Sequence, residues 1–228
     1  MTAMERLKVN PAKVNDRPFY HVVKRLFDIV ASACGLIPLS PLFLFLVIKI
    51  RSEDEGPAFY SQERIGKNEK PFKMWKFRSM VVNADKLLDE LEDENEVDGA
   101  MFKIKDDPRV TKIGHVIRKY SLDELPQLWN VLIGDMSLVG PRPPLPSEVE
   151  EYTNYDKQRL TVMPGCTGLW QVTRRSEADF DEMVWLDIVY INHSGMIEDL
   201  KLMIREQLMG FHVLINKLIQ TLFSKKEN

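Results

Sequence analysis

The chain carries a long apolar run close to its N-terminus. Residues 29–50 read IVASACGLIPLSPLFLFLVIKI, with Lys49 as the single charged residue. A run of about 18 or more apolar residues is long enough to lie in a bilayer as a helix. The pattern predicts a membrane helix over residues 21–50, preceded by a polar leader over residues 1–20. A helix buried in the core of a soluble protein is the alternative that the pattern leaves open.

Prolines and flanking charges indicate that this helix is broken. Pro38 and Pro41 lie inside the run, and each removes a helix hydrogen bond and clashes with the preceding turn. A straight span usually carries its basic residues at the cytoplasmic end, but here they flank both ends: Lys24, Arg25, Lys49 and Arg51. This favours a re-entrant hairpin that bends near Ser40 and Pro41, with the Ser40 hydroxyl satisfying a freed backbone group. A kinked spanning helix remains the alternative.

Beyond residue 50 the pattern becomes that of a compact domain, which we place at residues 51–199. Two short alternating runs, at residues 58–65 and 72–77, flank a turn at residues 66–71 and predict a β-hairpin. Helical periodicity is present at residues 83–94, 113–120, 147–160 and 179–192, and in an amphipathic C-terminal helix at residues 200–228. The expected class is α+β and mainly helical: a re-entrant membrane hairpin plus a cytosolic domain with a small β-hairpin and amphipathic interfacial helices.

The charge distribution points to anionic partners. The formal net charge is −3, but residues 85–98 alone hold eight acids and one lysine, which leaves 26 acidic and 30 basic residues elsewhere. A mildly basic body suits anionic substrates or an anionic membrane surface. No recognisable nucleic-acid module accompanies the basic residues, so we expect no nucleic-acid partner. Cys34 and Cys166 have no metal-ligand spacing, which fits a reducing cytoplasmic setting.

Residues 118–143 concentrate the candidate chemistry. Adjacent acids, Asp123 and Glu124, lie between Arg118 and Arg142. Arginine binds phosphate oxygens bidentately, and this neutralisation lets a carboxylate approach phosphorus and form an acyl phosphate. Ser121 and Glu124 also match a capping box at a helix start. The two interpretations are compatible, because a helix N-terminus is itself an anion site.

Several long motifs resemble those of a known family. They are KMWKFRSM (residues 73–80), DPRVTKIGHVIRKYSLDELPQLWNVL (107–132), GDMSLVGPRP (134–143) and PGCTGLWQV (164–172). Together they are similar to the bacterial sugar transferases, the monotopic polyprenyl-phosphate phosphoglycosyl transferases. The resemblance covers most of residues 22–205 and is closest to a minimal form without the multi-span N-terminal region of larger members.

The resemblance implies roles for individual residues. Asp123 is expected to be the nucleophile, and Glu124 to hold Mg²⁺ against the diphosphate. The residues expected to bind substrate phosphates are Arg118, Arg142, Lys76 and Arg78. Further substrate-site candidates are Gln171, Asp187 and Arg64.

The resemblance also implies an activity and a location. The expected reaction transfers a sugar 1-phosphate from a UDP-sugar, such as UDP-glucose or UDP-galactose, to polyprenyl phosphate through a phosphosugar-aspartate. UMP is released and exopolysaccharide, capsule or O-antigen synthesis begins. We expect a bacterial inner-membrane protein whose catalytic domain faces the cytoplasm.

Two alternatives to this activity remain. The first is a membrane glycosyltransferase that moves the sugar alone and releases UDP. Such enzymes often use a D-x-D metal motif, which Asp179 and Asp181 supply. The second is a non-enzymatic membrane scaffold of the polysaccharide machinery, in which the acid pair only caps a helix.

Overall fold

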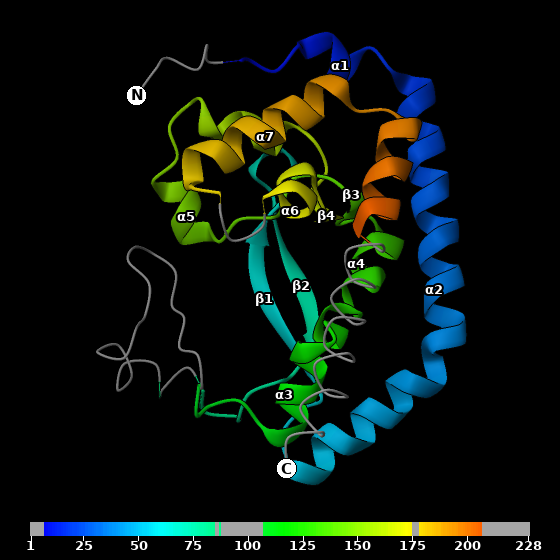
Figure 1. Ribbon diagram of the computed structural model, residues 1–228, viewed down its shortest axis with the longest axis vertical. Helices are drawn as coiled ribbons and strands as arrows, with labels where there is room; N and C mark the ends of the chain where they lie inside the picture. The colour runs from blue at the N-terminus through cyan, green and yellow to red at the C-terminus, as the bar shows by residue number, and fades with distance from the viewer. Residues whose placement is uncertain (1–6, 85–86, 88–106, 175–177, 207–228) are drawn as a thin grey trace, which may run out of the picture.

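A long helix runs along one side of a body built from short helices and small sheets (Figure 1). The computed structural model describes residues 7–84, 87, 107–174 and 178–206. The N-terminal elements are α1 (Pro11–Asn15), α2 (Pro18–Glu53), β1 (Phe59–Ile65), the 3-10 helix η1 (Lys67–Glu69) and β2 (Pro71–Phe77). The later elements are α3 (Lys112–Lys119), η3 (Leu122–Glu124), α4 (Gln127–Ile133), β3 (Ser137–Val139), α5 (Pro146–Glu150), η4 (Asp156–Thr161), β4 (Gly165–Thr167), α6 (Leu169–Thr173) and α7 (Phe180–His193). Residues 196–206 are also helical.

The mainly helical α+β class is therefore confirmed. Most of the helix predicted at residues 83–94 and the end of the C-terminal helix lie outside the described residues.

Helix α2 is continuous but bent, as Figure 1 shows. Pro38 and Pro41 lie inside it. The Ser40 hydroxyl donates to the carbonyl of Ile37 at 2.7 Å. That carbonyl would accept the N–H that Pro41 lacks, so the predicted role of Ser40 is confirmed. The helix bends without folding back on itself, because only two ladder bonds are lost, and the predicted re-entrant hairpin is not confirmed.

The first half of α2 is fastened to the body by polar contacts. Lys24 Nζ lies 2.9 Å from a carboxylate oxygen of Asp199. The Arg25 guanidinium donates to two carbonyls near the end of α4, at 2.5 and 2.9 Å. Buried Asp28 accepts a backbone N–H of β3 at 3.1 Å. Lys24 and Arg25, which flank the apolar run in the sequence, thus bind groups of the protein itself.

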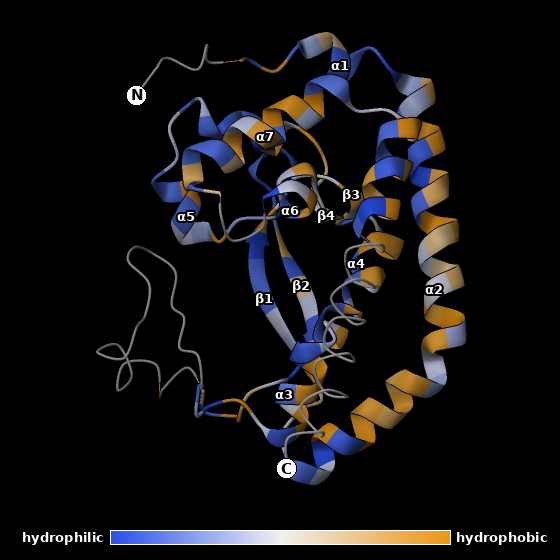
Figure 2. Ribbon diagram, in the orientation of Figure 1, coloured by the Kyte–Doolittle hydropathy of each residue, from blue (hydrophilic) through white to orange (hydrophobic). Residues whose placement is uncertain are grey.

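Many apolar side chains of α2 are nevertheless exposed. Within the described residues it is the one helix long and apolar enough to span a membrane, and only 11% of its most apolar window is buried. Its exposed apolar side chains recur mostly at helical spacing: Phe19, Val22, Leu26, Val30, Ile37, Leu44, Phe45 and Ile48. Figure 2 shows the strongly apolar part of α2 beyond the bend. Such exposure argues against a soluble core helix and is consistent with membrane association.

The predicted β-hairpin is confirmed. Strands β1 and β2 are antiparallel, with Phe59 opposite Phe77 and Ile65 opposite Pro71. At its base, Phe77 and Ile117 pack in one buried cluster with Leu46, on the inner face of α2. The second half of α2 therefore supports the hairpin and α3 together.

One buried amide fixes α4 to the hairpin. The Asn130 side chain accepts the N–H of Trp75 at 2.9 Å and donates to the carbonyl of Lys73 at 2.7 Å. Asn130 is fully buried, so these bonds satisfy polar groups that water cannot reach. This contact sets the position of β2, and hence of Lys76, relative to α4.

A second small sheet was not predicted. Strands β3 and β4 are parallel, with Ser137 opposite Gly165 and Val139 opposite Thr167. A Cβ atom on Gly165 would lie 2.1 Å from the backbone nitrogen of Gly140, so only glycine permits this approach.

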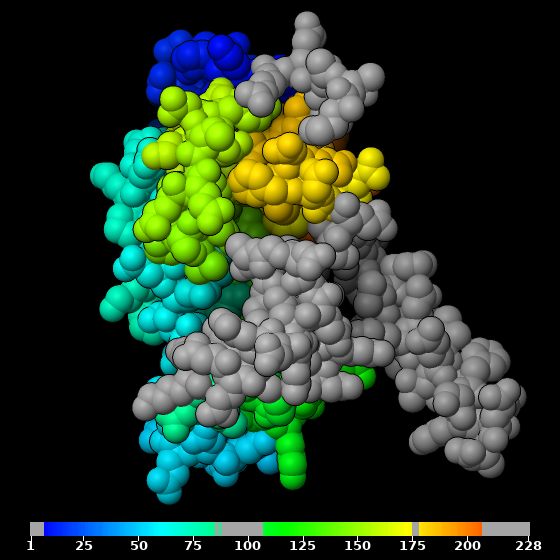
Figure 3. Space-filling view, turned by 90° about the vertical axis from the view of Figure 1, so that its left-hand side faces the viewer, coloured from blue at the N-terminus to red at the C-terminus, as the bar shows by residue number. Residues whose placement is uncertain are grey.

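The single helix predicted at residues 147–160 is wrong, because the chain forms α5 and η4 instead. The Asp156 carboxylate accepts both the N–H and the hydroxyl of Thr153, at 2.8 and 2.7 Å. These local bonds compete with a continuous helix. Figure 3 shows this stretch lying between the β1–β2 hairpin and α7.

Candidate active site

The adjacent acids sit on a tight turn between two helices. Ser121 adopts a left-handed conformation, with φ 55°, directly after α3, and η3 then carries Asp123 and Glu124. Ser121 makes no side-chain capping bond, so the predicted capping box is wrong. Glu124 is consequently not held by a helix cap.

Glu124 instead pairs with a lysine from β2. Lys76 Nζ lies 2.8 Å from Glu124 Oε1, and the two side chains are 20% and 43% exposed. Burial opposes ionisation of Glu124, but the charge and hydrogen bond of Lys76, with Arg142 and Arg64, outweigh it and lower the pKa of Glu124. Glu124 is therefore a carboxylate near neutral pH.

Asp123 has the opposite shift. Burial and the neighbouring charge of Glu124 raise the pKa of Asp123, against the opposing effect of Lys76 and Arg118. Its side chain is half-buried and is not among those that line the adjacent pocket. The structure thus places Asp123 beside the pocket residue Glu124, within the field of two of the predicted cations.

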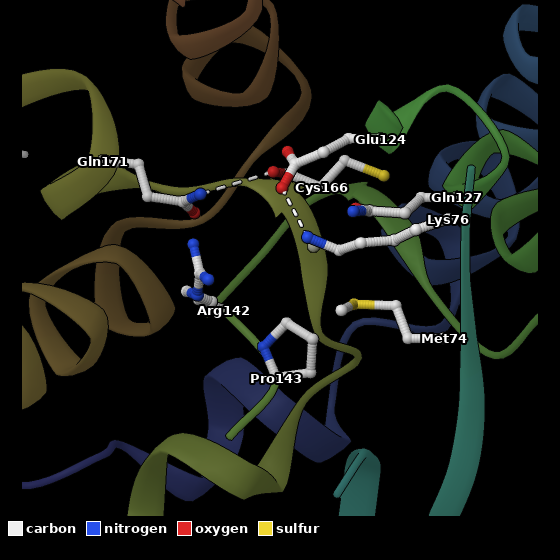
Figure 4. A pocket seen from close by; sticks show the side chains of 9 residues that line it. Met74, Lys76, Glu124, Gln127, Arg142, Pro143, Cys166 and Gln171 are labelled. Carbon is white, nitrogen blue, oxygen red and sulfur yellow. Dashed lines mark hydrogen bonds and ion pairs between the residues drawn. The ribbon is translucent and has the colours of Figure 1, made fainter. Parts of the chain in front are cut away.

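A pocket opens between η3, β2 and the loop that follows β3. Its lining residues are Met74, Lys76, Glu124, Gln127, Arg142, Pro143, Gly165, Cys166 and Gln171. Lys76 and Arg142 reach in from opposite sides (Figure 4). The enclosed volume is about 10 Å³, room for about one water molecule, so a larger ligand would occupy the open side.

Arg142 brings a second cation into this pocket, beside Lys76. Among the described residues, no hydrogen bond or ion pair of its guanidinium is observed. Its charge nevertheless acts on Glu124, whose pKa it helps to lower. Arg142 therefore keeps its fork of N–H donors for a ligand.

The other predicted arginines differ in position. Arg118 donates from Nε to the Ser79 hydroxyl at 2.9 Å and lies close enough to lower the pKa of Asp123. Arg78 is buried and donates to the Asp54 carbonyl at 3.0 Å, at the end of α2. It does not line the pocket, so the structure does not support a phosphate contact by Arg78.

The three further candidates also separate. Gln171 lines the pocket and donates to the Cys166 carbonyl at 3.4 Å. Arg64 is buried behind the pocket and donates to the Pro143 carbonyl at 3.1 Å. Asp187 is fully buried, so the expectation that it faces the active site is wrong. Its side chain pairs instead with Arg159.

Sequence reasoning missed several residues around the pocket. Gln127 and Cys166 line it, and Arg159 lies behind it. Burial raises the pKa of Cys166 to about 12, so this thiol stays protonated and lines the pocket without acting as a nucleophile. Cys166 lies within the PGCTGLWQV motif, which was the available signal, whereas Arg159 lies in a charged stretch without any motif.

The D-x-D motif has a structural explanation. Asp179 is the N-cap of α7 and accepts the N–H of Glu182 at 2.8 Å. Asp181 is exposed in the first turn of the same helix. Neither lines the pocket, so the motif gives no support to a second metal-dependent chemistry.

The described residues hold no group of three or more His, Cys, Asp or Glu side chains suited to a metal ion. A site that uses one carboxylate together with substrate phosphates is compatible with this finding, because Mg²⁺ is commonly held in that way.

A larger cavity lies elsewhere. It has a volume of about 210 Å³ and is lined by residues of α2, β3 and α7. None of the predicted site residues lines it.

Comparison with known proteins identifies the family. The family model described as bacterial sugar transferase matches residues 19–212. The chain is 49% identical over 184 residues to "Galactosyl transferase CpsE" of Streptococcus agalactiae, covering 80% of this chain and 41% of that protein. It is 44% identical over 204 residues to "Undecaprenyl-phosphate galactose phosphotransferase" of Salmonella typhimurium, covering 88% and 42%.

A relative of similar length also matches. The chain is 42% identical over 188 residues to "Exopolysaccharide production protein ExoY" of Sinorhizobium fredii, covering 81% of this chain and 83% of that protein. By contrast, the chain spans about two fifths of the two longer relatives above. The match to the family model over most of the chain shows that this protein belongs to the bacterial sugar transferase family.

Proposed function

We propose that this protein transfers a sugar 1-phosphate from a UDP-sugar to polyprenyl phosphate and releases UMP. One observation carries the proposal: Glu124 pairs with Lys76 in a pocket that the Arg142 guanidinium enters without a partner among the described residues, and Asp123 adjoins Glu124. Carboxylates next to free cations suit attack on an anionic phosphorus centre. Such a pocket needs a strongly anionic ligand, and a diphosphate is one.

The names of relatives support the same reaction. The Salmonella relative is an undecaprenyl-phosphate galactose phosphotransferase. A relative from Klebsiella pneumoniae, 40% identical over 206 residues, is a UDP-glucose:undecaprenyl-phosphate glucose-1-phosphate transferase. The chain spans 42% and 41% of these proteins, so the reaction is a proposal for this chain. UDP-galactose and UDP-glucose are the donors to test first.

In the first half-reaction, a carboxylate oxygen of Asp123 attacks the sugar-bearing phosphorus. The bond from that phosphorus to the bridging oxygen breaks, and UMP leaves with the electron pair. In the second half-reaction, an oxygen of polyprenyl phosphate attacks the same phosphorus, and Asp123 leaves as a carboxylate. No net proton transfer is needed, and two half-reactions on one nucleophile predict ping-pong kinetics.

The pocket residues lower the charge barrier to this attack. Lys76 and Arg142 approach from opposite sides and would bind phosphate oxygens of the donor (Figure 4). Arginine can bind two oxygens of one phosphate at once, which also fixes the orientation of the group. Gln171 lies on the same wall and would contact the donor near Arg142.

Glu124 is the residue that would hold Mg²⁺. It fits this role because it is ionised, lines the pocket and is 43% exposed, so one carboxylate oxygen can reach a ligand there. When bound, Mg²⁺ neutralises diphosphate charge and stabilises the leaving phosphate. Lys76, which now pairs with Glu124, would then be released toward the donor.

The exposed apolar face of α2 would seat the body at the membrane. We propose that α2 enters the cytoplasmic leaflet of the bacterial inner membrane and that the pocket lies at the headgroup level. A lipid-linked phosphate and a soluble nucleotide could then reach one site. The bend at Ser40 and Pro41 is compatible with a helix that returns to the side it entered.

Product analysis tests the proposal. Purified protein in detergent or nanodiscs should release UMP from UDP-glucose or UDP-galactose in the presence of undecaprenyl phosphate and Mg²⁺. Release of UDP would support a glycosyltransferase that moves the sugar alone. If folded protein turns over none of the UDP-sugars tested, the result would support the non-enzymatic membrane scaffold.

A further inference from the structure

The Pro-Arg-Pro segment that carries Arg142 is held by its carbonyl groups. Three of the residues at 141–144 are prolines, which have no N–H to donate. Four successive carbonyls nevertheless find donors: Pro141 from Gly165 N at 2.9 Å, Arg142 from Arg159 Nη2 at 3.4 Å, Pro143 from Arg64 Nη1 at 3.1 Å, and Pro144 from Ile65 N at 3.0 Å. The backbone of this segment is therefore restrained at every residue.

Two of these four donors are buried arginine side chains. Arg64 is 8% exposed and Arg159 is 5% exposed. They come from different elements, since Arg64 lies in β1 and Arg159 in η4. Backbone groups would have satisfied the carbonyls at lower desolvation cost, because burying a charge is unfavourable without compensation.

Arg159 is itself fixed by two partners. Asp187 Oδ2 lies 2.5 Å from Arg159 Nη2, and the Tyr152 hydroxyl accepts from Nη1 at 2.9 Å. Helix α7 and η4 pack together at this point. The order of contacts thus runs from Asp187 to Arg159 and then to the carbonyl of Arg142.

Arg64 is restrained differently. Its Nη2 donates to Gln62 Oε1 at 2.7 Å, and the described residues give it no ion pair. Burial and the nearby charge of Arg142 lower the pKa of Arg64. Arg64 nevertheless stays charged, because an arginine is not deprotonated in proteins, and its donors hold the segment.

We propose that Arg159, oriented by Asp187, and Arg64 are positioning residues for Arg142. They hold the backbone of residues 141–144 so that the Arg142 guanidinium points at the donor diphosphate before the ligand arrives. This inference rests on the proposed function, and it gives Asp187 a role that does not require contact with substrate.

A double-mutant cycle tests the proposal. Arg159→Met and Asp187→Leu are combined in the whole chain, because removing one partner of a buried pair would leave the other charge buried and uncompensated. kcat/KM for UMP release should fall about 10- to 100-fold. In an Arg142→Ala background the same pair should change kcat/KM less than about 2-fold, because positioning has nothing left to act on.

Two comparisons separate positioning from stability. The matched control is Arg109→Met with Asp107→Leu, another buried ion pair, with an Nη2–Oδ2 distance of 2.7 Å. Its effect on kcat/KM should be the same with and without Arg142. Arg64→Lys, which retains a charged donor for the Pro143 carbonyl, should keep more activity than Arg64→Met.

Binding of Mg²⁺-pyrophosphate, measured by calorimetry on the same variants, gives a readout independent of sugar transfer. The Arg159–Asp187 replacement should weaken this binding about 10-fold or more, and only when Arg142 is present. Equal losses in both backgrounds, in rate or in binding, would overturn the positioning role while leaving the proposed function intact. If the protein without substitutions binds pyrophosphate but does not turn over UDP-sugars, this would contradict the proposed function alone. If the protein without substitutions shows no pyrophosphate binding and no turnover, this would overturn both the positioning role and the proposed function.

Discussion

Arg142 and the arginines behind it carry the same side chain, but they differ in what their donors already hold. The Arg142 guanidinium has no partner among the described residues, whereas the guanidinium groups of Arg64, Arg78 and Arg159 each donate to a backbone carbonyl. The three paired arginines are buried and therefore cannot turn toward a ligand without losing those bonds. Charge alone thus does not identify a ligand-binding arginine; an exposed guanidinium that no described residue binds does.

The acids divide in the same way. Glu124 lines the pocket and is partly exposed, whereas Asp187 is buried and forms an ion pair with Arg159. The first can bind a ligand and the second can only orient protein groups. Variants on the two sides of this division should consequently fail in different ways.

The largest effect on the pocket side is expected from Glu124→Gln. Loss of this carboxylate should lower kcat about 10³-fold and remove the response to added Mg²⁺, because a neutral amide holds the ion poorly. Initial rates across a Mg²⁺ titration measure both. Full Mg²⁺ stimulation in the variant would place the metal elsewhere.

Arg142→Ala should follow, with a loss of about 10²- to 10³-fold in kcat/KM, since a free guanidinium aimed at the phosphates is removed. Arg142→Lys should recover only part of this loss, because an ammonium cannot form the bidentate fork. Steady-state kinetics with UDP-galactose checks both variants. Activity close to normal in Arg142→Ala would show that a free guanidinium does not mark the ligand-binding arginine.

Arg78→Met should show the opposite balance. We expect a loss of roughly 1–3 kcal/mol in unfolding free energy, because the Asp54 carbonyl loses its donor. kcat/KM of the folded protein should change less than about 3-fold. Thermal unfolding and steady-state kinetics separate the loss of stability from a loss of activity. A loss in kcat/KM comparable with that of Arg142→Ala would indicate that Arg78 contacts the ligand.

The smallest effect concerns pH. Asp123 must be ionised to attack, so kcat/KM should fall as pH drops through its pKa, which burial and Glu124 raise above the usual value of about 3.9. Lys76→Met should move this acid limb to higher pH, because Lys76 lowers the pKa of Asp123. pH profiles of the two proteins give the direction, and a shift to lower pH would contradict it.

Local patterns predicted much of the fold. The alternating runs gave the β-hairpin, helix periodicity gave α3 and α7, and the Ser-Pro break gave the hydroxyl bond at Ser40. The β3–β4 pairing could not be predicted, because three-residue strands carry no periodic signal. Nor could the internal partners of Lys24 and Arg25, which depend on segments more than 100 residues away.

The sequence motifs predicted which residues belong to the candidate site, but not all of their positions. Asp123, Glu124, Lys76, Arg118, Arg142 and Gln171 do gather at or beside one pocket. Arg78 and Asp187 do not, because a motif records which residues occur together and not which of their donors and acceptors are already bound. Arg159 lies outside every motif, and only its contacts reveal it.

The most direct measurement is the intact mass of the protein after incubation with a UDP-sugar and Mg²⁺ without lipid acceptor. We predict an added sugar phosphate on Asp123, lost again when polyprenyl phosphate is supplied, and no adduct in Asp123→Asn. An adduct that persists in Asp123→Asn would contradict Asp123 as the nucleophile. So would turnover without any adduct in rapidly quenched protein that carries no substitution.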